Sequence, residues 1–391
     1  MPRAPWDRKH RAALAGTRGG EYLPRPMPST TRFLRQYLRP SANAAIAAET
    51  WYMRGAQQLP ATVYRPAGIS GSLPGWVVLH GLTRTGRGHP GLKRFASAVA
   101  ASGCVVLVPE IPEWVELRVA PALTIDTIRE AVRALQRRDD VVHEHVGLFG
   151  FSFGATQALV ASTDEETASL LSGIAAWGGY CDMRRVFRFG LTGLHDIDGT
   201  TYETPPDPYG TWVMAGNYLA RVPGYEHTGA VADAMHRLAL EAGERGVYAW
   251  DPIYDESKRR YRATLPREHH ELFDMLAPLT TALRGDTARL LELADRLATT
   301  AYTIDPLLDP APFLDRVRNP VVLAHGRDDR LIPFSESIRL SRALPADRAR
   351  SLTITALFQH SGGTQGGLGA LGVAREGARF VLLLRRVLGI V

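Results

Sequence analysis

The sequence has very little cysteine and no long apolar run. Only two cysteines, Cys104 and Cys181, occur among 391 residues, so a disulfide framework like that of small secreted domains is excluded. The most apolar stretch, FVLLLRRVLGIV, is broken by Arg385 and Arg386 and falls short of the ~20 residues that span a membrane. The basic N-terminal segment lacks the apolar region of a signal peptide. We therefore expect a cytoplasmic protein with no membrane span, whose C-terminal stretch is an amphipathic helix on the core.

A block of charge of one sign is also absent. Lys and Arg total 46 against 40 Asp and Glu, a formal net charge of +6, and the basic residues are spread along the chain. This distribution indicates solubility and no nucleic-acid partner. The metal motifs H-E-x-x-H and C-x-x-C and the phosphate-binding G-K-[ST] are missing too. We therefore interpret the histidines of VVHEHV and REHHEL as surface residues and expect no metal and no cofactor.

What the chain does have is a series of short apolar runs rich in β-branched residues. GWVVLHG, GCVVLVPE, HVGLFG and SGIAAWGG alternate with segments of helical spacing such as TIDTIREAVRALQRR. Such runs predict strands covered on both faces, and hence a mostly parallel sheet with crossover helices. The alternation stops after Gly179 and returns with NPVVLAHGRDD and SLTITALF. The sequence thus predicts a doubly wound α/β sheet, interrupted after its sixth strand by a mainly helical insertion.

These patterns divide the chain into four segments. The prediction is an N-terminal arm with a short helix (1–58), the first part of the α/β core (59–179), a helical cap insertion (180–310) and the second part of the core (311–391). The cap should lie over the carboxyl ends of the strands, where it would form much of a pocket.

For six side chains the sequence allows two roles, packing in the core or lining the pocket. We interpret four aromatic residues of the insertion mainly as its own core, with pocket lining as the alternative: Trp212, Tyr218, Tyr248 and Trp250. Glu110 and Trp114 follow a strand near the expected mouth of the pocket and are minor candidates for lining it.

One serine stands where a strand passes almost directly into a helix. In GLFGFSFGATQALV the strand is predicted to end at Phe149 or Gly150, and the helix to begin near Ala155. So tight a turn strains the backbone of Ser152 and requires small residues at its flanks, as Gly150 and Gly154 are. Its side chain would be exposed at the amino end of a helix, where N–H groups favour developing negative charge. Ser152 is therefore a candidate nucleophile.

A serine nucleophile needs an imidazole base and a carboxylate that orients the imidazole. His360 follows the last predicted strand in LTITALFQHSGG, and the strand VVLAHG leads into a loop with Asp328 and Asp329. The order serine, aspartate, histidine along the chain is the one found in the α/β-hydrolase fold.

With HGLTRTG, GFSFG, GRDDRLIP and QHSGG in this order, the chain resembles the α/β-hydrolase superfamily from about Leu59 onward, the insertion excluded. Dienelactone-hydrolase-like and acyl-peptidase-like esterases are the relatives we expect to be nearest. In the family pattern G-x-x-D-x-x-[VI]-P the acid is the third residue after the glycine. The resemblance therefore implies Asp329 as the acid, with Asp328 and then Asp182 as alternatives.

The resemblance also implies an oxyanion hole. Two backbone N–H groups should face the oxygen that gains charge, one from Leu82 after the third strand and one from Phe153 after the nucleophile. His80 and His325, each in an HG pair at a strand end, are interpreted as structural residues.

The resulting prediction is a serine esterase that cleaves small carboxylic esters through an acyl-enzyme intermediate, with Ser152, His360 and Asp329 as the triad. An amidase or aminopeptidase with the same triad is the first alternative, and a non-catalytic binding protein on this fold is the second. A serine at this position argues against the dehalogenases and epoxide hydrolases of the fold, which use an aspartate. The natural substrate and the oligomeric state do not follow from the sequence.

Overall fold

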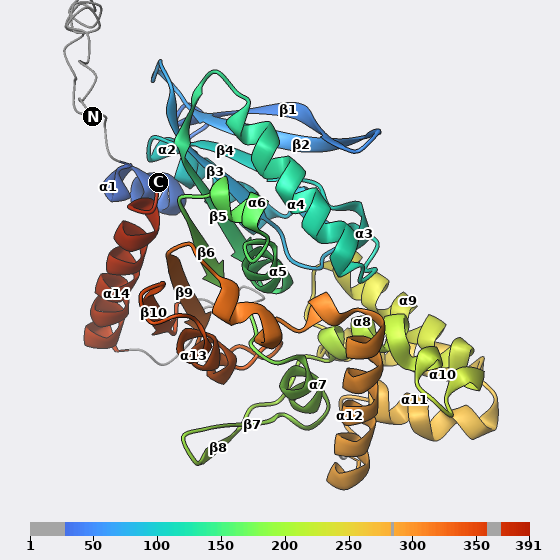
Figure 1. Ribbon diagram of the computed structural model, residues 1–391. Helices are drawn as coiled ribbons and strands as arrows, with labels where there is room; N and C mark the ends of the chain where they lie inside the picture. The colour runs from blue at the N-terminus through green and yellow to red at the C-terminus, as the bar shows by residue number, and fades with distance from the viewer. Residues whose placement is uncertain (1–27, 283–284, 358–368) are drawn as a thin grey trace, which may run out of the picture.

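An eight-stranded sheet forms the centre of the computed structural model, which describes residues 28–282, 285–357 and 369–391 (Figure 1). The strand order is β1-β2-β4-β3-β5-β6-β9-β10, and β2 runs in the opposite direction to the other strands of this sheet. The strands are β1 (Ala45–Arg54), β2 (Gln57–Pro66), β3 (Leu73–Leu79), β4 (Val105–Pro109), β5 (Val141–Phe151), β6 (Gly173–Trp177), β9 (Val321–Gly326) and β10 (Ala349–Thr355).

Helices cover both faces of this sheet. One face carries α1 (Thr30–Leu38), α2 (Pro90–Ala101) and α14 (Ala370–Leu388), and the other carries α4 (Pro121–Gln136), α5 (Phe153–Ala161) and α13 (Phe334–Ala343), with the short α3 (Pro112–Val115) and α6 (Glu165–Ser169) in the connections. Along β3, Val77 belongs to one apolar cluster while Trp76 and Val78 belong to the other. Because both faces of the sheet are buried, its central strands appear in the sequence as continuous apolar runs. The predicted fold class, a doubly wound, mostly parallel α/β sheet, is confirmed.

The structure corrects the prediction for residues 1–58. The described part of this segment contains the short helix α1, but residues 45–54 form β1, an edge strand paired with β2 along its whole length. Within β1 only Tyr52 is buried. Because an edge strand exposes most of its side chains, it lacks the apolar run that revealed the central strands.

The insertion between β6 and β9 is mainly helical, as predicted, and its helices gather at one end of the molecule (Figure 1). They are α7 (Met183–Thr192), α8 (Pro208–Tyr218), α9 (Gly229–Arg245), α10 (Asp255–Ala263), α11 (His270–Leu276) and α12 (Thr287–Ile304). A hairpin of β7 (Leu194–Ile197) and β8 (Thr200–Glu203) was not predicted. Its signal was the Asp198-Gly199 pair, whose φ angles of 53° and 75° suit a tight hairpin turn.

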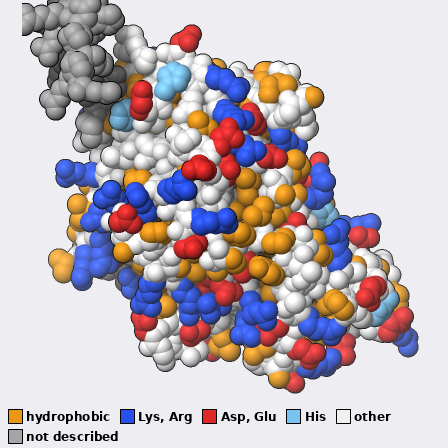
Figure 2. All heavy atoms as spheres, in the orientation of Figure 1, with side chains coloured by type: hydrophobic (Ala, Val, Ile, Leu, Met, Phe, Trp, Pro, Cys, Tyr) orange, Lys and Arg blue, Asp and Glu red, His pale blue; other side chains and the backbone are white. Residues whose placement is uncertain are grey.

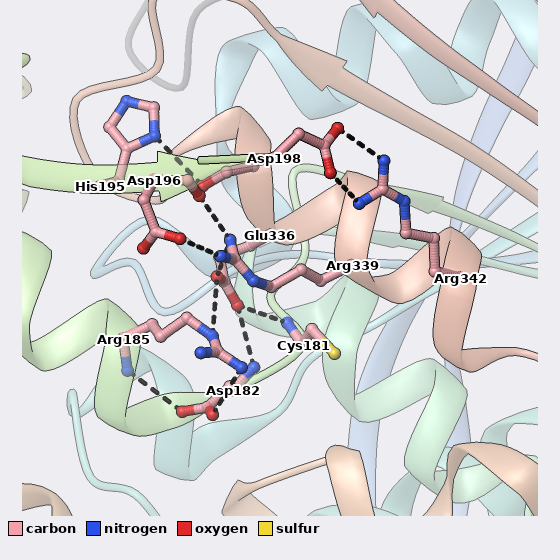
Figure 3. Close-up of polar contacts among 10 residues, drawn as sticks. Cys181, Asp182, Arg185, His195, Asp196, Asp198, Glu336, Arg339 and Arg342 are labelled. Carbon is pink, nitrogen blue, oxygen red and sulfur yellow. Dashed lines mark hydrogen bonds and ion pairs between the residues drawn. The ribbon is translucent and has the colours of Figure 1, made fainter. Parts of the chain in front are cut away.

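A buried carboxylate fastens the start of the insertion to α13. Glu336 Oε2 accepts hydrogen bonds from the backbone N–H groups of Cys181 (3.1 Å) and Asp182 (3.0 Å), just after β6 (Figure 3). Its other oxygen lies 3.7 Å from Arg185 of α7 and 3.7 Å from Arg339 of α13. Glu336 therefore joins the end of β6, α7 and α13 at one point.

Two ion pairs hold the hairpin to the same helix. Arg339 contacts the carboxylate of Asp196 at 2.8 Å, and Arg342 makes a two-pronged contact with Asp198 at 2.7 and 2.8 Å (Figure 3). The insertion is thus attached to α13 through both α7 and the β7–β8 hairpin.

Candidate active site

Ser152 occupies the single position between β5 and α5. The strand extends to Phe151 and the helix begins at Phe153, so the turn is tighter than the sequence predicted. The backbone of Ser152 has φ 56° and ψ −127°, a conformation that costs a non-glycine residue energy. Its N–H donates to the carbonyl of Trp177 at the end of β6 (2.8 Å). This bond helps to hold the strained residue at the carboxyl edge of the sheet.

Both flanking glycines are required by close backbone approach. A Cβ added to Gly150 would lie 2.2 Å from the carbonyl oxygen of Gly154, and one added to Gly154 would lie 2.4 Å from the carbonyl oxygen of His80. Neither neighbour is a flexible side chain that could move away. The expectation of small residues at positions 150 and 154 therefore has a direct steric basis.

The loop after β3 lies against the serine. A Cβ on Gly81 would be 3.2 Å from Ser152 Cβ and 3.6 Å from its Oγ. The buried His80 accepts the N–H of Ile111 at Nε2 (3.2 Å), so Nδ1 carries the proton and donates to the carbonyl of Gly81 (2.7 Å). In a trans peptide the N–H points away from the C=O, so this bond fixes the direction of the Leu82 N–H.

His80 is neutral as well as buried. Burial lowers its pKa to about 4, and its ring packs edge-on against Trp114. These contacts agree with the structural role expected for His80.

The loop after β9 holds Asp329 in a buried position. Asp329 Oδ1 accepts backbone hydrogen bonds from Leu331 (2.9 Å) and Ile332 (3.0 Å), and its Oδ2 lies 3.4 Å from His325 Nε2. His325 is fully buried, with its Nδ1 2.6 Å from Ser337 Oγ and its Nε2 2.8 Å from the Ile332 carbonyl. The carboxylate is thus oriented by the backbone of its own loop, and His325 supports that loop.

The expected base, His360, lies outside the described residues. The last described strand, β10, runs parallel to β9 and ends at Thr355, which is in register with Gly326. His360 follows Thr355 by five positions, and Asp329 follows Gly326 by three. The ends of β9 and β10, the strands that precede Asp329 and His360 in the sequence, are therefore neighbours in the sheet.

A cavity of about 1060 Å³ connects the other four predicted site residues, because Ser152, Phe153, Leu82 and Asp329 all line it. Asp328 is exposed and does not line it. Asp182 is also absent from its wall and caps α7 instead, accepting the N–H of Arg185 (3.1 Å). Of the three carboxylates considered from the sequence, Asp329 alone faces this space.

Apolar side chains of the insertion form much of the cavity wall. Those from α7, α8 and the segment after α9 are Met183, Val186, Phe187, Val213, Met214, Val247 and Tyr248. No lysine or arginine occurs among the described lining residues. The wall therefore suits a neutral, largely apolar ligand.

Among the six side chains left uncertain, Tyr248 lines the cavity. The cavity wall does not include the others, which are Glu110, Trp114, Trp212, Tyr218 and Trp250. Trp212 and Tyr218 are buried in the insertion, as the core interpretation expected.

One contributor to this site was not anticipated. Tyr209, at the start of α8, lines the cavity, and its hydroxyl donates to the carbonyl of Leu82 (3.1 Å). The two residues are 127 positions apart, and no local pattern in the sequence marks the pair.

Other kinds of site receive little support from the described part of the chain. There, no cluster of three His, Cys, Asp or Glu side chains suits a metal ion, and no helix is long and apolar enough to cross a membrane. Acidic and basic side chains are interspersed over the face shown in Figure 2.

No family model and no curated protein matches the sequence. Among solved structures, brefeldin A esterase, a bacterial homologue of human hormone-sensitive lipase, is similar at 18% identity and a TM-score of 0.46, over 90% of this chain and 77% of that one. An acylaminoacyl peptidase of Pyrococcus horikoshii is similar at 13% identity and a TM-score of 0.45, over 90% of this chain and 42% of that one. A 2,6-dihydroxy-pseudo-oxynicotine hydrolase is similar at 17% identity and a TM-score of 0.41, over 83% of this chain and 65% of that one. Similarity this low says nothing of activity.

Proposed function

We propose that the protein is a serine hydrolase of small carboxylic esters. The observation that carries this proposal is the strained Ser152, with φ 56°, at the tip of the β5–α5 turn and in the wall of a cavity shared with Asp329, Leu82 and Phe153. A strained serine at the start of a helix is the arrangement of a nucleophile elbow. The order of the motifs adds His360 as the base.

In the proposed reaction Ser152 Oγ attacks the ester carbonyl while His360 takes the hydroxyl proton. Asp329 holds His360 in the required tautomer and stabilises its cation. The N–H groups of Leu82 and Phe153 bind the oxyanion of the tetrahedral intermediate. His360 then gives the proton to the departing alcohol, leaving an acyl-enzyme, and a water that His360 deprotonates releases the acid.

The contacts of the cavity carboxylates favour esters over substrates with a free amino terminus. An aminopeptidase would need a carboxylate available for the substrate ammonium group. Of the acidic lining residues besides Asp329, Glu244 contacts Arg84 at 3.2 Å and Asp207 caps α8 by accepting the N–H of Tyr209 (2.9 Å). Both carboxylates already have partners, which supports a neutral ester as the substrate.

The test is turnover of short and medium p-nitrophenyl esters. Removing one member of such a triad lowers kcat by about 10³-fold or more in other hydrolases. We expect losses of this size for Ser152→Ala and His360→Ala, and at least about 10²-fold for Asp329→Asn. The matched control is Asp328→Asn, which changes the exposed neighbouring carboxylate and should keep activity within about twofold.

Each alternative function has its own readout. Unchanged activity in Ser152→Ala would defeat the mechanism. Faster turnover of p-nitroanilides or aminoacyl amides than of esters would favour the amidase or aminopeptidase. No reaction of a fluorophosphonate probe with Ser152 in the folded protein would favour a non-catalytic binding protein.

A further inference from the structure

The oxyanion loop is held from two sides. On the core side, His80 Nδ1 donates to the carbonyl of Gly81, in the same peptide group that carries the Leu82 N–H. On the side of the insertion, Tyr209 Oη donates to the carbonyl of Leu82 itself (3.1 Å). The two bonds bracket Leu82, and together they limit rotation about both of its backbone dihedrals.

Tyr209 is well placed to keep this bond. Burial raises the pKa of its hydroxyl, so the group stays protonated and able to donate. The side chain is partly buried and lines the cavity that contains Ser152.

The same turn of α8 is also fastened to the acid loop. The N–H of Asp207 donates to the carbonyl of Arg330 (2.7 Å), the residue after Asp329. The carboxylate of Asp207 in turn accepts the N–H of Tyr209 (2.9 Å). Two residues of the insertion thus contact the two loops that the proposed mechanism requires: Asp207 contacts the acid loop and Tyr209 contacts the loop of Leu82.

We propose that Tyr209 is a positioning residue for the oxyanion hole, and that the first turn of α8 couples that hole to the acid loop. This proposal rests on the proposed function. Tyr209 acts through the Leu82 backbone, so losing its hydroxyl should weaken binding of the transition state more than binding of the ester. The oxyanion forms only on the way to and in the tetrahedral intermediate, so losing the hydroxyl should lower kcat and leave KM nearly unchanged.

The test compares Tyr209→Phe with the wild type on the best p-nitrophenyl ester. We expect kcat to fall about tenfold with KM within about twofold. Affinity for a trifluoromethyl ketone, whose adduct with Ser152 carries an oxyanion, should fall by a similar factor. Replacing Tyr209 with 3-fluorotyrosine, which keeps the shape and the hydroxyl, should retain kcat within about twofold.

The matched control is Tyr218→Phe in the same helix. Tyr218 is buried, its hydroxyl donates to Asp305 Oδ2 (2.7 Å), and it does not line the cavity. This variant removes a comparable hydroxyl from α8 and should leave kcat, KM and ketone affinity within about twofold.

Two kinds of failure can be told apart. If the wild type is active and Tyr209→Phe keeps its kcat, or loses no more than Tyr218→Phe, the positioning role is wrong. A rise in KM at constant kcat would also overturn it, because Tyr209 would then bind the ester directly. A wild-type protein that neither hydrolyses esters nor reacts with a fluorophosphonate would overturn the proposed function and this assignment together.

Discussion

Ser152 can occupy its strained conformation because Gly150 and Gly154, two positions away on either side, have no side chains. The closest contact made by a Cβ on Gly154 would be with the His80 carbonyl, which belongs to the loop that carries Leu82. The spacing between the turn at Ser152 and the loop that carries Leu82 is therefore set by direct contact between backbone atoms.

Gly154→Ala should destabilise the protein strongly. A Cβ 2.4 Å from the His80 carbonyl oxygen forces the backbone apart, at a cost of about 3 kcal/mol in the free energy of unfolding. Urea unfolding measures this change. The control is Gly229→Ala at the start of α9, where the added Cβ meets nothing within 4 Å and should give a small gain, about 0.5 kcal/mol. Equal stabilities of the two variants would contradict the steric argument.

Some residues of the site could be predicted from the sequence and others could not. Ser152 and Asp329 stand at the ends of apolar strands in recognisable motifs, so local spacing was enough to single them out. Tyr209 and Glu336 act through contacts with residues more than 100 positions away. Only the folded chain brings such pairs together.

Among the strands, too, some could be predicted from the sequence and others could not. Strands such as β5 and β9 were predictable because both of their faces are buried. The edge strand β1 and the β7–β8 hairpin were not predicted, because most of their side chains are exposed and form no continuous apolar run. Tertiary position, more than intrinsic propensity, decided what the sequence revealed.

The junction between β6, α7 and α13 should make stability depend on pH. Burial raises the pKa of Glu336 to about 7, although two backbone N–H groups, Arg185 and Arg339 favour its charged form. The folded protein therefore holds this proton more tightly than the unfolded chain does, where the pKa is 4.5. The stabilisation is complete below about pH 4.5 and is lost as pH rises through about 7.

We expect Glu336→Gln to flatten this dependence. From pH 5 to pH 8 the wild type should lose on the order of 3 kcal/mol through Glu336, and the variant should not. Urea unfolding at the two pH values measures the difference.

The control for this experiment is Glu376→Gln. Glu376 is also buried, and burial raises its pKa, but bonds from Thr355 and Ala356 and the charge of Arg379 lower it below its ordinary value overall. It is ionised in both states throughout this range, so its substitution should shift stability equally at pH 5 and pH 8. A Glu336→Gln protein that keeps the wild-type slope would refute the assignment.

For the whole molecule, the sheet and the insertion share one apolar cluster. That cluster includes Leu148 of β5 and Val77 of β3 together with Leu238 of α9 and Leu293 of α12. A continuous core favours cooperative unfolding, in which the insertion does not open separately from the sheet.

Leu238→Ala should therefore weaken the sheet as well as the insertion. Removing this fully buried side chain costs about 2–5 kcal/mol. Amide hydrogen exchange should accelerate by the same factor in peptides of α9 and of β5. Ile253→Ala, at a side chain that is 47% exposed, is the control and should change neither. Faster exchange confined to α9 would show that the insertion unfolds independently.

The pairing of β6 with β9 affects how the protein is made. Ile174 pairs with Val321, so β6, whose residues are all buried, has no partner on one edge until the ribosome has added the entire insertion. An open apolar strand edge invites aggregation, and contacts so distant in sequence form slowly. Asp329 and His360 are synthesised later still. A nascent chain would thus carry Ser152 without the acid and base of the proposed triad until late in translation, and its exposed β6 edge makes chaperone binding most valuable in that interval.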